Sequence, residues 1–335
     1  MTLAPWNEDA WLRLQQRRER GSLPHAILLG GPAGLRKREF ADAFAAAMLC
    51  QTPTSGGHAC GNCRACRLFA AGTHPDLVRV NLELRDDSGG SEQKRRTEIT
   101  VDQMRSLSER LGLTAQFGGA QIALIDPADT LNVNASNALL KTLEEPTPGT
   151  IIVLVADQPS RLSATIRSRC QRIDFRIPPV SVALAWLLAQ DVDKKQIDDA
   201  LRASEGNPGM ALSWLNGGAM KVRAEVARDL VALNCGSATA YDVAQRWSRD
   251  NADLRLHFAA SLTREQAMAE LQARGNAALA LTSAVELTKL TAWFERANRT
   301  RELLRGPLRQ DLALLELLAD WTAVGRGAMD RGFAR

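Results

Sequence analysis

Short apolar runs and amphipathic stretches alternate along the first half of the chain. The apolar runs at 121–125 and 151–155 are rich in branched residues and are only a few residues long, which predicts strands buried on both faces. Each run is followed by a helical pattern, so the order predicts an α/β domain with a parallel sheet. The predicted strands are residues 26–29, 76–80, 121–125, 151–155 and 172–177, and the predicted helices are 6–20, 39–49, 100–111, 136–145 and one that starts near 159.

The second half of the chain has helical periodicity throughout. Pro178 and Pro179 follow the last predicted strand and indicate a domain boundary. The pattern predicts three domains: residues 1–178 with the sheet, 179–218 as a small three-helix lid, and 219–335 as an all-α bundle. The predicted helices are 181–190, 197–204, 208–215, 223–233, 238–247, 253–273, 277–303 and 308–324.

Composition limits the cellular compartments and the kinds of partner that are plausible for the protein. The 335 residues carry a formal net charge of +4, which is only weak support for a nucleic-acid partner. No apolar run approaches the roughly 18 residues of a membrane span, and the N-terminus lacks the pattern of a secretory signal. Four of the six cysteines are clustered, which favours a metal site in a reducing compartment over disulfides. We therefore expect a cytoplasmic protein without a membrane partner.

The clustered cysteines are Cys50, Cys60, Cys63 and Cys66, spaced C-x9-C-x2-C-x2-C. Three lie on one tight turn, and Cys50 at the end of the preceding helix supplies a fourth thiol. Four thiolates form a closed tetrahedral Zn²⁺ site with no position for substrate, so a structural zinc module at about residues 50–70 is predicted. His58 and His74 are near enough in sequence to replace a ligand. The alternative is four reduced thiols that pack as small apolar groups.

A glycine-rich turn joins the first predicted strand to the next helix, which is the setting of a phosphate-binding loop. Gly31, Gly34 and Lys37 fit such a loop. Arg36 stands where a glycine belongs, and a residue with a Cβ resists positive φ. Arg38 stands where a Ser or Thr hydroxyl would bind Mg²⁺, and a guanidinium cannot ligate a cation. The loop is therefore predicted to be degenerate, with an ordinary tight turn as the alternative.

A longer run, residues 122–170, contains the segment Ser-Asn-Ala-Leu-Leu-Lys-Thr-Leu-Glu-Glu-Pro at 136–146 and ends in Ser168-Arg169-Cys170. This run resembles the clamp-loader ATPases of the AAA+ group, and most of all the delta-prime family of the bacterial DNA polymerase III clamp loader. The resemblance implies a P-loop NTPase-like AAA+ domain, a helical lid, and a C-terminal collar for oligomerisation. It also strengthens the zinc prediction.

Active relatives follow the aspartate at position 126 with an acidic residue, but this chain has Pro127, which offers no general base. Ala156 stands where relatives place a polar residue after the next strand, and the lid helix opens with Pro208-Gly209 where they carry an arginine. Together with the loop, these losses indicate that the isolated chain does not hydrolyse ATP.

Arg169 belongs to a motif that is complete, so the resemblance implies an arginine finger that acts in trans on the ATP of a neighbouring subunit. Lys141 is a second candidate cation for the same interface. The alternative for each is a surface salt bridge, and for Lys141 it is strong because Glu145 lies four residues on.

The sequence thus favours a non-hydrolysing clamp-loader subunit that helps ATP-dependent loading of the sliding clamp onto primed DNA in replication. The implied partners are the ATPase subunits and the delta subunit in a hetero-pentamer, with the clamp and primer-template DNA reached through the complex. The holoenzyme is a DNA-directed DNA polymerase, a nucleotidyltransferase. Two alternatives stay open: the active ATPase subunit of the same machine, and a zinc-dependent DNA-binding module, for which Arg64 and Arg67 are the nearby basic residues.

Overall fold

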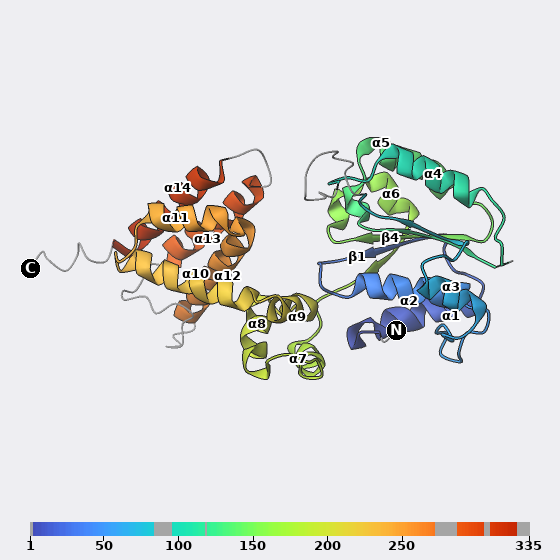
Figure 1. The fold of residues 1–335 in the computed structure, drawn as a ribbon, viewed down its shortest axis with the longest axis horizontal. Coiled ribbons are helices and arrows are strands. Elements are labelled where there is room, and N and C mark those ends of the chain that lie inside the picture. The colour runs from blue at the N-terminus through green and yellow to red at the C-terminus, as the bar shows by residue number, and fades with distance from the viewer. Residues whose placement is uncertain (1–2, 84–95, 118, 272–286, 305–308, 327–335) are drawn as a thin grey trace, which may run out of the picture. The chain divides into compact units, whose positions relative to one another are not determined.

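The computed structural model describes residues 3–83, 96–117, 119–271, 287–304 and 309–326 (Figure 1). Its contacts divide the chain into two compact units, Met1–Gln190 with Gly206–Met210, and Asp191–Glu205 with Ala211–Arg335. The three-domain division stays a prediction. The sequence also predicts a polar loop at 85–98, most of which lies outside the described residues. The predicted helix segment at 277–286 lies wholly outside them.

A five-stranded parallel sheet forms the centre of the first unit, which confirms the predicted fold class of this part of the chain. The spatial order of the strands is β2-β3-β4-β1-β5, so β1 lies between the two strands that come last in the chain. The strands are β1 Ala26–Gly30, β2 Leu77–Val80, β3 Gln121–Ile125, β4 Thr150–Ala156 and β5 Gln171–Asp174. All strands run the same way, so their carboxyl ends meet at one edge of the sheet, where ligands of open α/β folds bind.

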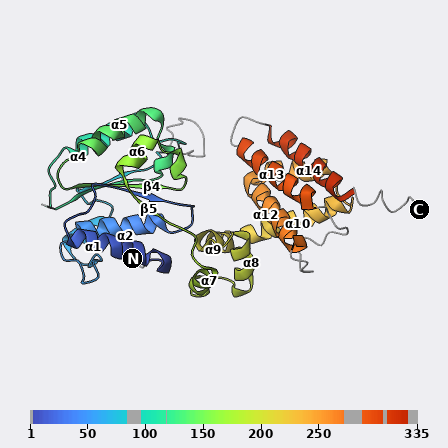
Figure 2. The same cartoon turned by 180° about the vertical axis from the view of Figure 1, so that it is seen from behind.

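Helices cover both faces of the sheet because successive strand residues point to opposite sides. In β1, Ile27 and Leu29 pack in a core with α1 and α2, whereas Leu28 packs with α4, α5 and α6. Figures 1 and 2 show these two helical layers. The helices are α1 Glu8–Glu19, α2 Lys37–Leu49, α3 Arg64–Ala70, α4 Val101–Leu111, α5 Val133–Glu144, α6 Ala164–Arg169 and α7 Val180–Leu188.

Several boundaries differ from the sequence prediction for local reasons. The helix predicted at 6–20 buries Trp11 and Leu14 on the face toward α2, whereas the side chain of Leu12 is exposed. The helix expected to start near Pro159 is a 3₁₀ turn, and α6 starts later because the Ser163 hydroxyl accepts a hydrogen bond from the backbone N–H of Ile166.

The second unit is helical in its described part. Trp293 and Trp321 stack edge to face, with ring centroids 4.8 Å apart, and their indole N–H groups donate to the carbonyls of Leu317 and Leu230. This pair joins α10, α13 and α14 through buried aromatic contacts. The helices are α8 Ile197–Ala203, α9 Pro208–Asn216, α10 Ala219–Asn234, α11 Ala240–Arg249, α12 Ala252–Leu271, α13 Leu287–Leu303 and α14 Gln310–Arg326; α9 begins in the first unit.

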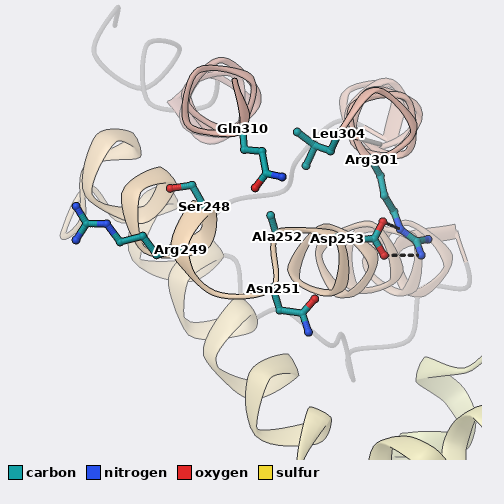
Figure 3. Close-up of a pocket in the computed structure, with 8 residues that line it drawn as sticks. All are labelled: Ser248, Arg249, Asn251, Ala252, Asp253, Arg301, Leu304 and Gln310. Carbon is teal, nitrogen blue, oxygen red and sulfur yellow. Dashed lines mark hydrogen bonds and ion pairs between the residues drawn. The ribbon is translucent and has the colours of Figure 1, made fainter. Parts of the chain in front are cut away.

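A pocket of about 360 Å³ opens beside the start of α12 (Figure 3). On one wall Arg301 of α13 makes a bidentate ion pair with Asp253, at 2.9 and 3.1 Å. The guanidinium is thus already committed to a carboxylate and contributes to helix packing. Across the described residues, no helix is both long and apolar enough to span a membrane.

Candidate functional site

The loop after β1 has the backbone of a phosphate-binding loop. Gly31 and Gly34 have positive φ values of 145° and 82°. Arg36 also has a positive φ, 62°, a conformation that a residue with a Cβ adopts only at a cost. Contacts of its side chain offset the strain: an ion pair to Glu39 at 3.2 Å and a cation–π contact with Trp186 at 5.6 Å.

Lys37, the first residue of α2, is the loop lysine, and its side chain is 1% exposed. The ammonium donates to the carbonyls of Gly31 and Pro32 at 2.6 and 2.7 Å, and pairs with Asp157 at 2.6 Å. An ammonium has three donors, so all three are used inside the chain. Burial lowers the pKa of Lys37 below its ordinary value, and Asp157 opposes that shift only in part.

Arg38 bridges the ends of two strands. Its Nε donates to Asp126 at 2.8 Å, directly after β3, and its NH2 group donates to Asp157 at 3.1 Å, directly after β4. Burial raises the pKa of Asp126, and Arg38 only partly reverses this. For Asp157 burial acts the same way, but hydrogen bonds and charges from Lys37 and Arg38 outweigh it and hold the pKa below its usual range.

Asp126 and Asp157, the two carboxylates at this edge of the sheet, therefore bind the guanidinium of Arg38. In a working phosphate-binding loop the position after the lysine is a hydroxyl that binds Mg²⁺. Here the positive charges of Lys37 and Arg38 balance the two carboxylates. A guanidinium has no lone pair with which to bind a metal ion. The arrangement fixes α2 to β3 and β4 by charge-assisted hydrogen bonds.

Asp157 was missed by sequence reasoning, which stopped at Ala156. Ala156 is fully buried and pairs in register with Gly30, so it lies within the strand. The next residue is the first that can turn its side chain toward the loop. The signal was available, because an acidic residue directly after a parallel strand lies at the same edge as Asp126.

The start of α9 packs directly on the loop. Asn207 donates from Nδ2 to the carbonyl of Ala33 at 2.7 Å, and its Oδ1 caps the helix by accepting from the N–H of Met210. A Cβ on Gly209 would lie 1.9 Å from the carbonyl oxygen of Gly34. Glycine is therefore required at position 209 for this backbone contact.

The cysteine cluster lies between α2 and α3, and the structure brings together the four residues predicted from spacing. The four Sγ atoms all lie within 4.8 Å of one another, with Cys50–Cys63 and Cys60–Cys66 both at 3.9 Å. Sulfurs about 2.3 Å from one tetrahedral ion are about 3.8 Å apart, so the group could bind a metal ion.

Hydrogen bonds favour the thiolate form in part of this cluster. Backbone N–H groups of Cys60, Cys63 and Cys66 donate to the sulfurs of Cys50, Cys60 and Cys63. The Thr52 hydroxyl, followed by the backbone N–H groups of Asn62 and Cys63, lowers the pKa of Cys60 to about 6, whereas burial raises that of Cys66 to about 12. Short amide-to-sulfur contacts of this kind stabilise negative sulfur.

Neither nearby histidine belongs to the cysteine group in the described structure. His58 stacks on Trp11, with ring centroids 4.5 Å apart and planes 5° from parallel. His74 is buried, and its Nδ1 accepts from the backbone N–H of Asp76. Sequence reasoning also missed α3, the short helix that carries Cys66 and begins with Cys63 as its N-cap.

Arg169 is the last residue of α6, and its side chain is 35% exposed. It pairs with Glu144, at the end of α5, at 2.5 Å. Lys141 on α5 is exposed and makes no ion pair among the described residues, including with Glu145. Both cations thus lie on the surface, and neither takes part in the ion pairs of the loop.

The fold and this loop define a class. A parallel sheet, a strand–glycine-rich turn–helix unit with its lysine, and acidic residues after two neighbouring strands are typical of the P-loop nucleotide-binding α/β proteins.

Comparison with known proteins identifies the family. Residues 6–179 match the family model described as DNA polymerase III, delta subunit. The DNA polymerase III subunit delta' of Pseudomonas aeruginosa is 39% identical over 246 residues, 73% of this chain and 71% of the relative. That of Escherichia coli is 34% identical over 260 residues, 77% of this chain and 74% of the relative. The chain belongs to the family of DNA polymerase III delta-prime subunits.

A solved DNA polymerase III gamma subunit-related protein from Thermotoga maritima is also similar, with a TM-score of 0.45 and 15% identity. The match covers 94% of this chain and all of that chain. This similarity is too low to support an inference.

Asp157→Asn tests the ion pairs at the strand ends. At pH 7 the variant leaves Lys37 without its counter-charge, so we expect a loss of about 1–3 kcal/mol in the free energy of unfolding. Because the folded pKa of Asp157 is lowered, its stabilisation is complete above the unfolded pKa of about 3.9 and disappears as the pH falls through the folded value. Urea unfolding should therefore show a difference from wild type that shrinks below about pH 4.

The matched control is Asp191→Asn, which removes an exposed carboxylate that makes no ion pair in the described part of the chain. It should leave the free energy of unfolding within about 0.5 kcal/mol of wild type. A difference for Asp157→Asn that stays constant from pH 7 to pH 3 contradicts the assigned pKa direction.

Proposed function

We propose that the protein is a non-hydrolysing subunit of the clamp loader of bacterial DNA polymerase III. In this role it helps ATP-dependent loading of the sliding clamp onto primed DNA in replication, while other subunits hydrolyse ATP. Its family membership supports this assembly, with clamp-loader ATPase subunits and a delta subunit as partners in a hetero-pentamer. The clamp and the primer-template DNA are then reached through the complex.

The observation that carries the proposal is the bridge made by Arg38. The guanidinium spans Asp126 and Asp157, and the same Asp157 takes one of the three hydrogen bonds of Lys37. A nucleotide with Mg²⁺ would have to displace these internal pairs and would find no hydroxyl ligand at position 38. Pro127 supplies no base for the attacking water. The active-ATPase alternative is disfavoured for these reasons.

Arg169 is proposed to act in trans. The chain's own loop is filled by internal cations, whereas the Arg169 side chain is partly exposed and is held by one surface ion pair and one hydrogen bond to a backbone carbonyl. A planar, permanently charged guanidinium is suited to meet the developing charge on a γ-phosphate held by a neighbouring subunit. This arginine is the catalytic group that the chain contributes to the machine.

The metal is proposed to be a structural Zn²⁺ held by the four cysteines. The spacing of the four sulfurs fits a closed tetrahedral set, and such a set leaves no position for substrate or water. The DNA-binding alternative is disfavoured because Arg64 packs over the ring of Phe117, at 5.6 Å, so this side chain already has a partner within the chain.

The zinc proposal predicts about one zinc per chain in purified protein that was kept reduced and never chelated. Cys63→Ser should lower the zinc content and the stability of the module without abolishing the ATPase of a mixed complex. Cys235→Ser is the matched control, because Cys235 is exposed and lies outside the cluster. Elemental analysis checks both, and protein without zinc refutes the assignment.

The isolated chain should not turn over ATP, because its loop has lost the metal hydroxyl and its strand end has lost the general base. A steady-state phosphate-release assay on the pure chain, with a clamp-loader ATPase subunit as positive control, measures this. Turnover of ~1 s⁻¹, the low end of ordinary enzymes, would mean that the chain is an active ATPase.

Arg169→Ala should lower the DNA- and clamp-stimulated ATPase and the loading rate of a reconstituted clamp loader. Fingers of this kind are worth roughly 10³–10⁵ in rate at one site, and the whole ring loses less because only one site borders this subunit. Arg169→Lys should rescue little, since an ammonium cannot reproduce the planar fork.

Folding and complex mass should be unchanged in Arg169→Ala, since the side chain makes only surface contacts. Arg161→Ala, an exposed arginine on the preceding turn, is the matched control and should leave loading unchanged. Wild-type loading by Arg169→Ala would show that Arg169 is only a surface residue.

A further inference from the structure

The guanidinium of Arg169 is turned back onto its own chain. Its NH2 group pairs with Glu144 Oε1 at 2.5 Å, and its NH1 group donates to the backbone carbonyl of Thr165 at 3.2 Å. Thr165 lies one turn earlier on α6, and Glu144 is the last residue of α5. The side chain is therefore held between the ends of two neighbouring helices.

This geometry conflicts with the role proposed for the arginine. A guanidinium that meets a phosphoryl group with two parallel hydrogen bonds needs a free edge of its planar fork. Here both terminal nitrogens already have acceptors within the chain. Engagement of a neighbour's phosphate therefore requires that at least one of these contacts is released.

We propose that Glu144 is a restraining partner of Arg169, which holds the finger in this withdrawn position until the charge that develops on the γ-phosphate of an adjacent subunit's nucleotide in the transition state displaces it. The inference rests on the proposed function of Arg169 in trans. The displacing group is a nucleoside triphosphate, whose terminal phosphate offers more negative charge and more acceptor oxygens than one carboxylate.

The strength of the restraint suits a reversible contact. The two side chains are 35% and 49% exposed, so solvent screens their attraction. A pair of this kind shifts an equilibrium by at most about fivefold. That is enough to bias the resting position of Arg169, and small against the roughly 10³–10⁵ that a finger supplies at one site.

Glu144→Gln tests the restraint, because it keeps the shape of the side chain and removes its charge. In a reconstituted clamp loader at saturating ATP with DNA and clamp, kcat should rise, by at most about fivefold at the bordering site and by less over the whole ring. KM for ATP should be unchanged, because the finger acts in the transition state. Complex mass should match wild type.

Glu145→Gln is the matched control. It removes the same charge from the next residue, and Glu145 makes no ion pair with Arg169 in the described structure. Its kcat should equal that of wild type. A rise as large as that of Glu144→Gln would assign the effect to general electrostatics at the end of α5 and overturn the inference.

A double-mutant cycle separates restraint from other roles. Glu144→Gln should have no effect on kcat in the Arg169→Ala background, because there is no finger left to release. An equal rise in that background, or a fall in kcat for Glu144→Gln alone, overturns the inference.

The same set of variants distinguishes the two hypotheses. If Arg169→Ala is silent, the proposed function of the arginine fails, and the restraint fails with it. If Arg169→Ala lowers kcat while Glu144→Gln equals wild type, the finger stands and only the restraint is wrong.

Discussion

The site depends on one interaction, the contact of the Arg38 guanidinium with the carboxylates that end β3 and β4. Parallel strands bring Asp126 and Asp157 to the same edge of the sheet, where their like charges repel unless a cation lies between them. In active nucleotide-binding loops a dissociable metal ion is present in this region. Here the cation is covalently attached to the chain, one residue after the loop lysine.

Contacts within the chain explain how the loop keeps its geometry although it lacks residues of a working phosphate-binding loop. Arg36 has the left-handed backbone that glycine normally supplies, and Glu39 and Trp186 stabilise its side chain there. Asn207 and Gly209 pack against the loop from the other side. The loop is thus held by contacts within the chain, so its conformation does not require a bound phosphate.

The sequence was sufficient to predict the parts that follow from local pattern. The continuous apolar runs at 121–125 and 151–155 predicted β3 and β4, because a strand buried on both faces has no polar period. Cysteine spacing predicted the four sulfurs that the structure brings within 4.8 Å, because three of them lie within seven residues of the chain. The helix predicted at 100–111 is confirmed as α4, which Thr100 and Gln103 cap through a capping box.

Contacts between distant segments could not be predicted in this way. Nothing in the local pattern links Arg38 to Asp157, which is 119 residues away, or shows that Arg36 can tolerate positive φ. The exposed position of Leu12 depends on how α1 packs against the rest of the first unit. Helical periodicity alone does not decide which of two neighbouring residues lies at the edge of the buried face. The ion pair of Arg169 with Glu144 likewise depends on how α5 and α6 pack together.

Pairing, and not exposure alone, separates Lys37 and Arg38 from Arg169 and Lys141, since the side chain of Arg38 is 44% exposed and that of Arg169 is 35% exposed. The Lys37 side chain is 1% exposed and Arg38 is tied to two carboxylates, so neither is available to a ligand without breaking internal pairs. Arg169 and Lys141 lie on the surface, where an ion pair is weak or, for Lys141, absent among the described residues. A guanidinium built into the loop cannot leave with a product, and a ligand reaches the loop only by breaking these pairs. The outer group, Arg169 and Lys141, lies at the surface, and for this reason the proposed contribution of the chain to ATP hydrolysis in an assembly is placed on Arg169 and not on its own loop.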